Sequence, residues 1–432
     1  MKRFLQAMLV VMFLFMLIGC SDKNSEETED QDEEEVNISG HWTGAIHLPG
    51  QPLHIALTID GADEGDMSIP MQGIEGANSL PVDTLKIEED KVTITVNLQG
   101  SILSLEGAVE EGEFKGDFTQ NGQTFPFTLY EREETEGEFL SVETAIGTLN
   151  GELELPEGDG PFPVMIIIPG SGPTDRNGNT AMGDNDGLKQ IAEQLATEGI
   201  ASLRYDKRGA GKNKEAVGEE VDINFTQFTD DAQAWVELLT EDERFTSVGI
   251  IGHSQGSLEG MVTAQSNDVD VFISLAGIGR GMDEVLYEQL QAQLPEGLLE
   301  ESEEILQQLK QGKAVAEISP ELQAIFRPSV QPFLISMMQL NPTEELEKLT
   351  IPVMLVNGER DIQVPATDAE ILHEAKPDTE LLILENMNHV LKDTTEDIQD
   401  NYLTYSNPTL PVADGLMDGM IQFLKENNFI EE

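Results

Sequence analysis

The sequence predicts a small all-β domain followed by a larger α/β domain with a doubly wound, mostly parallel sheet. Strand-length segments with alternating apolar residues and turn signals fill residues 37–135. From residue 137 to the end, strand-like apolar runs alternate with helical patterns, which is typical of a parallel sheet covered by helices. The length of 432 residues also favours two cores over one.

The all-β prediction for 37–135 depends on alternation with period two. Apolar residues alternate with polar ones along 53–59, 92–98 and 125–129. Short polar breaks with turn chemistry, such as Asn121-Gly122, separate these runs. A small antiparallel barrel or sandwich is expected.

Buried strands and amphipathic helices alternate after residue 137. The expected strands lie at 142–146, 151–155, 164–168, 200–205, 247–251, 269–275, 351–357 and 380–385, and the expected helices at 188–196, 226–240 and 255–265. Between 280 and 346 the sequence is helix-like and has no strand signal. An insertion at this point would lie above the carboxyl ends of the strands, where ligands bind, so we interpret 280–346 as a lid.

The first twenty residues resemble a bacterial lipoprotein signal. Lys2 and Arg3 precede an apolar stretch that is shorter than a membrane span and ends at Cys20, the single cysteine of the chain. The resemblance implies a signal peptide at 1–19, a fatty-acylated (palmitate-bearing) Cys20 and an extracytoplasmic, membrane-anchored protein. An uncleaved N-terminal helix or a chance cysteine is the alternative.

The composition is strongly acidic. Eighty-two acidic and 24 basic residues give a formal net charge of −58. Because phosphate backbones are bound by basic faces, nucleic acid is excluded as an expected partner. The acidic tether at 20–36 accounts for only −8, from nine acids and one lysine. We interpret the remaining excess as a solvated acidic surface, with steering of a cationic substrate as the less favoured reading.

Ser254 is the predicted nucleophile. It lies in Gly-His-Ser-Gln-Gly (252–256), directly after the strand 247–251 and directly before a helix. A serine in a G-x-S-x-G motif between a strand and a helix lies on a sharp, strained turn that exposes its hydroxyl.

His389 is the predicted base, since a serine hydroxyl needs one to accept its proton. Of the six histidines, three lie in the β-domain. His253 adjoins the nucleophile but is expected to point elsewhere, and His373 lies in a probable helix. His389 follows the last strand in a loop at its carboxyl end.

Asp361 is the predicted acid that orients the base. It lies in the turn that follows the buried strand 351–357, and Glu359 in the same turn is the alternative. The chain order Ser254, Asp361, His389 matches the serine–acid–histidine order of a known hydrolase architecture.

Two backbone amides should form an oxyanion hole. One is the amide of Gln255, which follows the nucleophile. The other is expected in the glycine-rich turn after strand 164–168, and we favour Ser171 over Gly172. This turn is not a phosphate-binding loop, because no lysine follows at the required spacing.

These motifs together resemble the α/β-hydrolase superfamily, and within it bacterial esterases related to dienelactone hydrolases. The resemblance covers roughly the last 300 residues and is carried by GSGPTDRNGN (170–179), YDKRGAG (205–211) and GHSQG (252–256). It implies the α/β-hydrolase fold. It also implies that 205–211 is a structural turn in which Asp206 and Arg208 form a buried pair.

The chain departs from the superfamily pattern at two positions. Pro169 stands where a histidine is common, which leaves the loop donor of the oxyanion hole less defined. Gln255 replaces the more frequent Met, Gly or Glu, and this exchange is expected to tune the acyl pocket.

The expected activity is hydrolysis of a small-molecule carboxylic ester through an acyl-enzyme on Ser254. The alternatives are a serine peptidase or amidase of the same fold, or a lipid-anchored binding protein without activity. No cofactor, metal or protein partner is expected. His41, His47 and His54 have no further ligand at metal-site spacing. Lid residues are expected either to line the acyl pocket or to pack within the lid, namely Phe326, Phe333, Leu334, Met337 and Met338.

Overall fold

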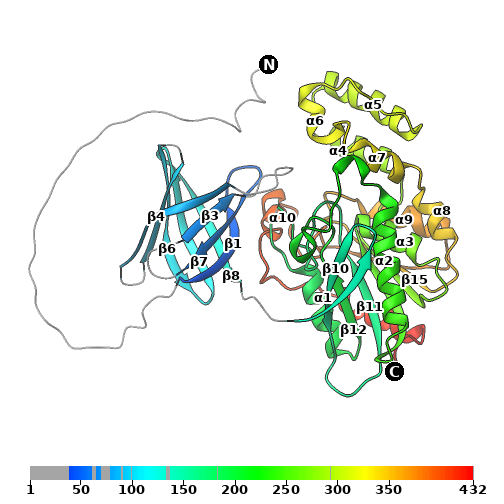
Figure 1. The fold of residues 1–432 in the computed structure, drawn as a ribbon. Helices are drawn as coiled ribbons and strands as arrows, with labels where there is room; N and C mark the ends of the chain where they lie inside the picture. Colours follow the sequence, from blue (N-terminus) through cyan, green and yellow to red (C-terminus); the bar gives the residue numbers. More distant parts are fainter. Residues whose placement is uncertain are drawn as a thin grey trace, which may run out of the picture. The chain divides into compact units, whose positions relative to one another are not determined.

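The computed structural model describes residues 38–60, 65–69, 78–88, 91–98, 100–132, 137–181, 183–291 and 293–431. The predicted signal peptide, Cys20 and the acidic tether lie outside these residues. The chain divides into two compact units, Met1–Glu134 with Ala181–Gly183, and Thr135–Thr180 with Asp184–Glu432. Figure 1 shows the strands and helices of the two units.

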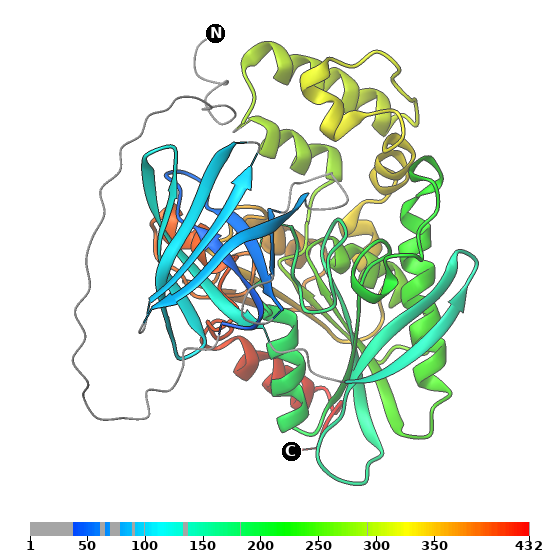
Figure 2. The same ribbon diagram turned by 60° about the vertical axis from the view of Figure 1, so that its left-hand side comes forward.

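The first unit contains a closed barrel of eight antiparallel strands. Each strand pairs with the next along the chain, and β1 closes the barrel against β8. The strands are β1 (Gly40–Ile46), β2 (Leu53–Ile59), β3 (Gly65–Ile69), β4 (Asn78–Glu88), β5 (Lys91–Leu98), β6 (Ser101–Glu110), β7 (Glu113–Gln120) and β8 (Gln123–Arg132). The predicted all-β domain is therefore a barrel, and Figure 2 shows the strands wrapping around it.

Side chains fill the barrel interior. In β5, for example, the alternate residues Val92, Ile94 and Val96 are buried, as the period of two requires. Trp42, Phe114 and Phe127 are almost completely buried. Phe114 meets the other two rings edge to face, with ring centroids 6.4 Å from Trp42 and 4.9 Å from Phe127. The interior is a packed core.

The second unit is built on an eight-stranded mixed sheet of order β16-β15-β14-β13-β11-β12-β10-β9. The strands β11 (Phe162–Ile168), β12 (Ala201–Tyr205), β13 (Phe245–His253), β14 (Val271–Leu275), β15 (Val353–Gly358) and β16 (Glu380–Leu384) run parallel. The hairpin β9 (Glu138–Thr144) and β10 (Gly147–Glu154) extends one edge antiparallel. The predicted doubly wound, mostly parallel sheet is confirmed.

Helices cover both faces of this sheet, because β11 and β13–β15 are apolar on both sides and both sides must be buried. One face packs against α1 (Gly187–Thr197) and α11 (Leu416–Glu426). The other face packs against α2 (Phe225–Thr240), α3 (Gln255–Thr263), α8 (Pro342–Glu347) and α9 (Ala366–Ala375). Two 3-10 turns, Gly211–Asn213 and Glu220–Asp222, and the helix α10 (Ile398–Thr404) complete the unit.

The predicted lid is a helical insertion between β14 and β15. It contains α4 (Met282–Gln291), α5 (Glu296–Lys310), a 3-10 turn at Pro320–Leu322, α6 (Gln323–Phe326) and α7 (Gln331–Met338), and it ends with α8. Figures 1 and 2 both show α4–α7 gathered at one end of the sheet. These helices have a small apolar core of their own. Among the described residues, no helix is long and apolar enough to cross a membrane.

Candidate active site

Ser254 lies on a strained turn between β13 and α3. Its backbone angles are φ 54° and ψ −120°, in a region that residues with a side chain rarely adopt. The Ser254 amide donates to the Leu275 carbonyl of the neighbouring strand at 2.9 Å, which fixes the turn to the sheet edge. The strain leaves the hydroxyl clear of the strand.

The two glycines of the turn allow other backbone segments to come close. A Cβ at Gly256 would lie 2.4 Å from the Ile168 carbonyl oxygen and 2.6 Å from that of Pro169. A Cβ at Gly252 would lie 2.3 Å from the Gly256 carbonyl oxygen. Any side chain at either position would force backbone to move, so the motif needs glycine at both positions.

The structure brings Ser254, His389 and Asp361 together from the ends of three strands. His389 Nε2 is 3.1 Å from Ser254 Oγ, and His389 Nδ1 is 2.8 Å from Asp361 Oδ2. His389 and Asp361 are 5% and 8% exposed. With the Asp361 carboxylate ionised, Nδ1 carries the proton and donates it, which leaves Nε2 as the acceptor facing the serine hydroxyl.

The second oxygen of Asp361 is held by the backbone of its own turn. Oδ1 accepts hydrogen bonds from the amides of Gln363 at 2.8 Å and Val364 at 2.9 Å. These bonds orient the carboxylate so that Oδ2 faces His389. Glu359, the alternative acid, is exposed at the surface. The geometry therefore favours Asp361.

His253 contacts the base, which the sequence analysis missed. Its Nε2 donates to the backbone carbonyl oxygen of His389 at 2.8 Å, and the two ring centroids are 5.0 Å apart. Burial, and then the neighbouring His389, lowers the pKa of His253 to about 4, so the ring is neutral near pH 7. Instead of pointing elsewhere, this side chain connects the nucleophile turn to the base loop. The place of His253 directly before the nucleophile was the one sequence feature that could have predicted this contact.

Asn388 fixes the loop that carries the base. It is fully buried, and its side-chain amide donates to Asn401 Oδ1 at 3.1 Å and to Thr404 Oγ1 at 2.6 Å. Its side-chain oxygen accepts from the Lys392 amide at 3.1 Å. These bonds connect the loop to α10, a helix that the sequence analysis did not predict.

The two predicted oxyanion donors lie on segments that flank Ser254. Gln255 is the first residue of α3, and within the described residues neither its amide nor that of Ser171 has a hydrogen-bond acceptor. A Cβ at Gly170 would lie 3.4 Å from Ser254 Cβ, so the turn that carries Ser171 lies directly against the nucleophile. Two unpaired amides beside the nucleophile can donate hydrogen bonds to an oxygen atom on which negative charge develops, and so stabilise it.

Asp206 and Arg208 do not pair with each other, which corrects the expectation drawn from the resemblance. Asp206 accepts instead from the amide of Arg176 at 2.8 Å and from its guanidinium at 3.2 Å. Arg208 donates to both oxygens of Asp231 on α2, at 2.5 and 2.7 Å. Asp206 and Arg208 therefore bind partners on different segments of the chain, Arg176 after β11 and Asp231 on α2.

The lid residues singled out by sequence mostly serve packing. Phe326, Leu334 and Met338 belong to the lid's own apolar core. Met337 packs into the core of the main sheet, and Phe333 meets Phe228 of α2 edge to face at 5.8 Å. All five therefore make packing contacts, and three of them do so within the lid's own core.

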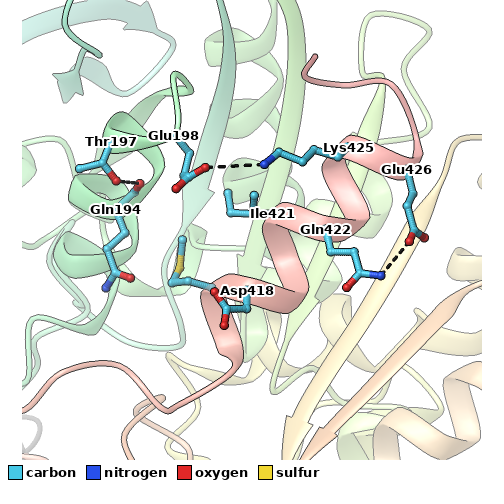
Figure 3. A pocket seen from close by; sticks show the side chains of 9 residues that line it. Gln194, Thr197, Glu198, Asp418, Ile421, Gln422, Lys425 and Glu426 are labelled. Atoms are coloured by element: carbon cyan, nitrogen blue, oxygen red, sulfur yellow. Dashed lines mark hydrogen bonds and ion pairs between the residues drawn. The ribbon is translucent and has the colours of Figure 1, made fainter. Parts of the chain in front are cut away.

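A separate hollow of about 490 Å³ lies between α1 and α11 (Figure 3). Its lining includes the ion pair of Glu198 with Lys425, and none of its residues belongs to the constellation around Ser254. Within the described ranges, no group of three His, Cys, Asp or Glu side chains has a geometry that could hold a metal ion.

Comparisons with known proteins agree with this geometry. A family model described as serine aminopeptidase, S33, matches residues 185–394, a range that contains Ser254, Asp361 and His389. Esterase EstD of Thermotoga maritima is 29% identical over 296 residues, which cover 68% of this chain and 70% of EstD. The larger unit of the chain has the α/β-hydrolase fold.

More distant likenesses of this α/β-hydrolase are found among solved structures. Est1E from Butyrivibrio proteoclasticus is 17% identical with a TM-score of 0.45, over 68% of this chain and 99% of Est1E. The α/β-hydrolase GrgF from Penicillium sp. sh18 is 20% identical with a TM-score of 0.46, over the same shares of the two chains.

Proposed function

We propose that this α/β-hydrolase cleaves small-molecule carboxylic esters through an acyl-enzyme on Ser254. The observation that carries the proposal is the continuous chain of contacts from Asp361 through His389 to Ser254, at 2.8 and 3.1 Å. The enzyme is a carboxylic ester hydrolase, as its relationship to an esterase over two thirds of its length also supports.

Acylation begins when Ser254 Oγ attacks the ester carbonyl carbon while His389 Nε2 takes the hydroxyl proton. The carbonyl oxygen becomes an oxyanion, and the amides of Gln255 and Ser171 stabilise it. His389 then gives its proton to the leaving alcohol oxygen as the carbon–oxygen bond breaks. Asp361 stabilises the imidazolium that forms during this step.

Deacylation repeats the sequence with water. His389 takes a proton from the water, whose oxygen attacks the acyl carbon, and the second oxyanion uses the same two amides. The proton returns to Ser254 Oγ as the acid product leaves. Side chains of the chain itself supply every proton transfer.

A serine peptidase or amidase is the second candidate, and the family model described as serine aminopeptidase favours it. Ester and amide cleavage share the acylation chemistry, so the site geometry alone does not separate them. The separating experiment measures kcat/KM on matched p-nitrophenyl esters and p-nitroanilides with the same acyl groups, with Ser254→Ala as the blank. We expect the esters to be preferred. Preference for an N-terminal aminoacyl anilide would establish the peptidase instead.

We further propose that the enzyme works outside the cytoplasm, anchored through a lipid on Cys20. The sequence pattern of residues 1–20 supports this proposal. Cys20→Ser should move the protein out of the detergent phase in phase partitioning, because two or more acyl chains hold a protein firmly in a bilayer. Unchanged partitioning of the Cys20→Ser variant would favour an uncleaved helix.

A further inference from the structure

A buried ion pair lies beside the predicted oxyanion hole. Lys207 Nζ donates to Glu259 Oε1 at 2.6 Å, and the two side chains are 1% and 0% exposed. Lys207 follows β12, whereas Glu259 lies in the middle of α3. Burial lowers the pKa of Lys207 and raises that of Glu259, so each charge is maintained by the other.

Stability alone does not explain this pair. A buried ion pair is often no more stabilising than apolar residues of the same volume, because desolvation offsets the attraction. The second oxygen of Glu259 is buried and has no partner within the described part of the chain. An incompletely satisfied buried charge needs another explanation.

Glu259 is also bonded to one oxyanion residue. The side-chain amide of Gln255 donates to the same Oε1 at 2.7 Å. Gln255 is the first residue of α3, where the amide has no intrahelical acceptor and must point to whatever lies beyond the helix. The buried side chain of Gln255 is therefore hydrogen-bonded, one helical turn further along α3, to the same Glu259 carboxylate that binds Lys207.

Lys207 is bonded through its backbone to the other oxyanion segment. Its amide donates to the Thr174 carbonyl at 3.0 Å. Thr174 is buried, and its hydroxyl donates to the Ser171 carbonyl at 2.7 Å. Lys207 is therefore linked to both halves of the hole, through its backbone and Thr174 on one side and through its ammonium group and Glu259 on the other.

We propose that Lys207 and Glu259 are positioning residues that hold the amides of Ser171 and Gln255 at the spacing an oxyanion requires. The inference rests on the proposed function. Donors on two separate segments act together only if their separation is kept constant, because small misplacements in an active site are costly. The ion pair is the side-chain step of this link, which reaches the Ser171 segment through the Lys207 amide and Thr174.

The test replaces the pair by apolar residues of similar volume, Lys207→Met/Glu259→Met, in the full-length enzyme. Removing both charges avoids leaving one unpaired in the core. We expect the double variant to melt cooperatively, with KM within threefold of wild type. Its kcat should fall by about 10- to 100-fold, since deleting a whole oxyanion donor costs about 100- to 1000-fold.

A trifluoromethyl ketone inhibitor gives the readout that is specific to the hole. Ser254 Oγ adds to its carbonyl carbon, His389 takes the hydroxyl proton, and the resulting oxyanion occupies the hole. The affinity for this inhibitor should fall by the same factor as kcat. A merely structural role would change the melting temperature without this parallel loss.

The control removes a second buried ion pair, Arg208→Met/Asp231→Leu, which joins the same turn to α2. These side chains are 5% and 4% exposed, and Arg208 hydrogen-bonds to Asp231, Ala216 and Thr144, none of which lies on an oxyanion segment. This variant should keep kcat and inhibitor affinity within threefold of wild type. Equal losses in both double variants would overturn the inference.

A folded Lys207→Met/Glu259→Met variant with kcat and inhibitor affinity within threefold of wild type would also overturn the inference.

If that variant does not fold, Gln255→Leu is the deciding variant, because it removes the hydrogen bond from Gln255 to Glu259 and leaves the ion pair intact. A parallel loss of about 3- to 10-fold, the size of one hydrogen bond, supports the inference, and unchanged values overturn it. Wild type is assayed first. Wild type without ester hydrolysis would overturn the proposed function itself.

Discussion

At the scale of single residues, His253 connects two segments of the site, the nucleophile turn and the loop that carries His389. Its backbone precedes Ser254, and its ring donates to the carbonyl oxygen of His389 at 2.8 Å. Because the pKa of His253 is lowered to about 4, the ring stays neutral and does not repel the imidazolium that forms on His389. The residue is well placed to keep the base loop against the nucleophile.

Replacing His253 by phenylalanine should lower kcat/KM for an ester by roughly 3- to 10-fold, the equivalent of one hydrogen bond of about 1 kcal/mol. The ring volume is retained, so the loss reports the missing donor. His253→Gln restores an N–H donor and should recover part of the activity. His373→Phe is the matched control. His373 lies in the last turn of α9 and contacts Thr379, so this substitution should leave activity nearly unchanged. Equal effects at positions 253 and 373 would contradict this account of His253.

The carboxylate of Asp175 should make the free energy of unfolding depend on pH. Burial raises its pKa to about 7, although the amides of Asn177 and Asn179 donate to its carboxylate. Its unfolded value is near 3.8. Between these two pH values the folded state binds more protons than the unfolded state, so stability falls as pH rises through this window.

Asp175→Asn removes this titration and keeps an oxygen for the two amides. The free energy of unfolding of wild type minus that of the variant should fall by on the order of 2–4 kcal/mol between about pH 4 and pH 7. Asp231 and His253 also titrate with shifted pKa values, but they are present in both proteins and cancel in the difference. Urea unfolding at four pH values measures it, and two parallel curves would contradict the assigned pKa.

The positions of single site residues could be predicted from the sequence where the residue directly follows the end of a strand. Ser254, Asp361 and His389 each follow a strand of the parallel part of the sheet, and such strands end at one edge. The direction of a side chain on a turn was not predictable. The ring of His253 and the guanidinium of Arg208 find their partners only through contacts between segments far apart in the sequence.

At the scale of elements, the turn from β13 to α3 depends on close backbone approach. Gly256 lies under the carbonyl oxygens of Ile168 and Pro169, which end β11. The strand–turn–helix order was predictable, because the sequence changes from an apolar run to the motif and then to a helical pattern. The boundaries differ by a few residues, as where α3 ends at Thr263 instead of 265. Helix ends depend on tertiary contacts that the pattern does not contain.

Gly256→Ala should reduce kcat/KM by about 100-fold or more, since a backbone shift of about 1 Å at the nucleophile has that effect. The added methyl also overpacks the turn and should cost about 1–3 kcal/mol of stability. Gly297→Ala in α5 is the control, because a Cβ there meets nothing within 4 Å. It should leave activity unchanged and, by helix propensity, keep or slightly raise the melting temperature. A fully active Gly256→Ala enzyme would show that the close approach is not needed.

At the scale of the whole molecule, the formal charge of −58 belongs to a chain that folds into two compact units. Self-repulsion of this size opposes compact folding, and added salt screens it. The melting temperature should therefore rise between about 0.01 and 1 M NaCl, where the Debye length falls from about 30 to 3 Å. Meanwhile kcat/KM for a neutral ester should stay nearly constant. Strong preference for a cationic ester at low salt, lost as salt rises, would instead show substrate steering.

Covalent labelling tests whether Ser254 is the nucleophile of a serine hydrolase. The enzyme is treated with a fluorophosphonate, and the site of the adduct is mapped by mass spectrometry of peptides. We expect one adduct per folded chain, on the peptide containing Ser254. No adduct is expected in Ser254→Ala or in heat-unfolded wild type, because activation by His389 requires the folded site. An adduct on another residue, or equal labelling of Ser254→Ala, would contradict the assignment of Ser254 as the nucleophile.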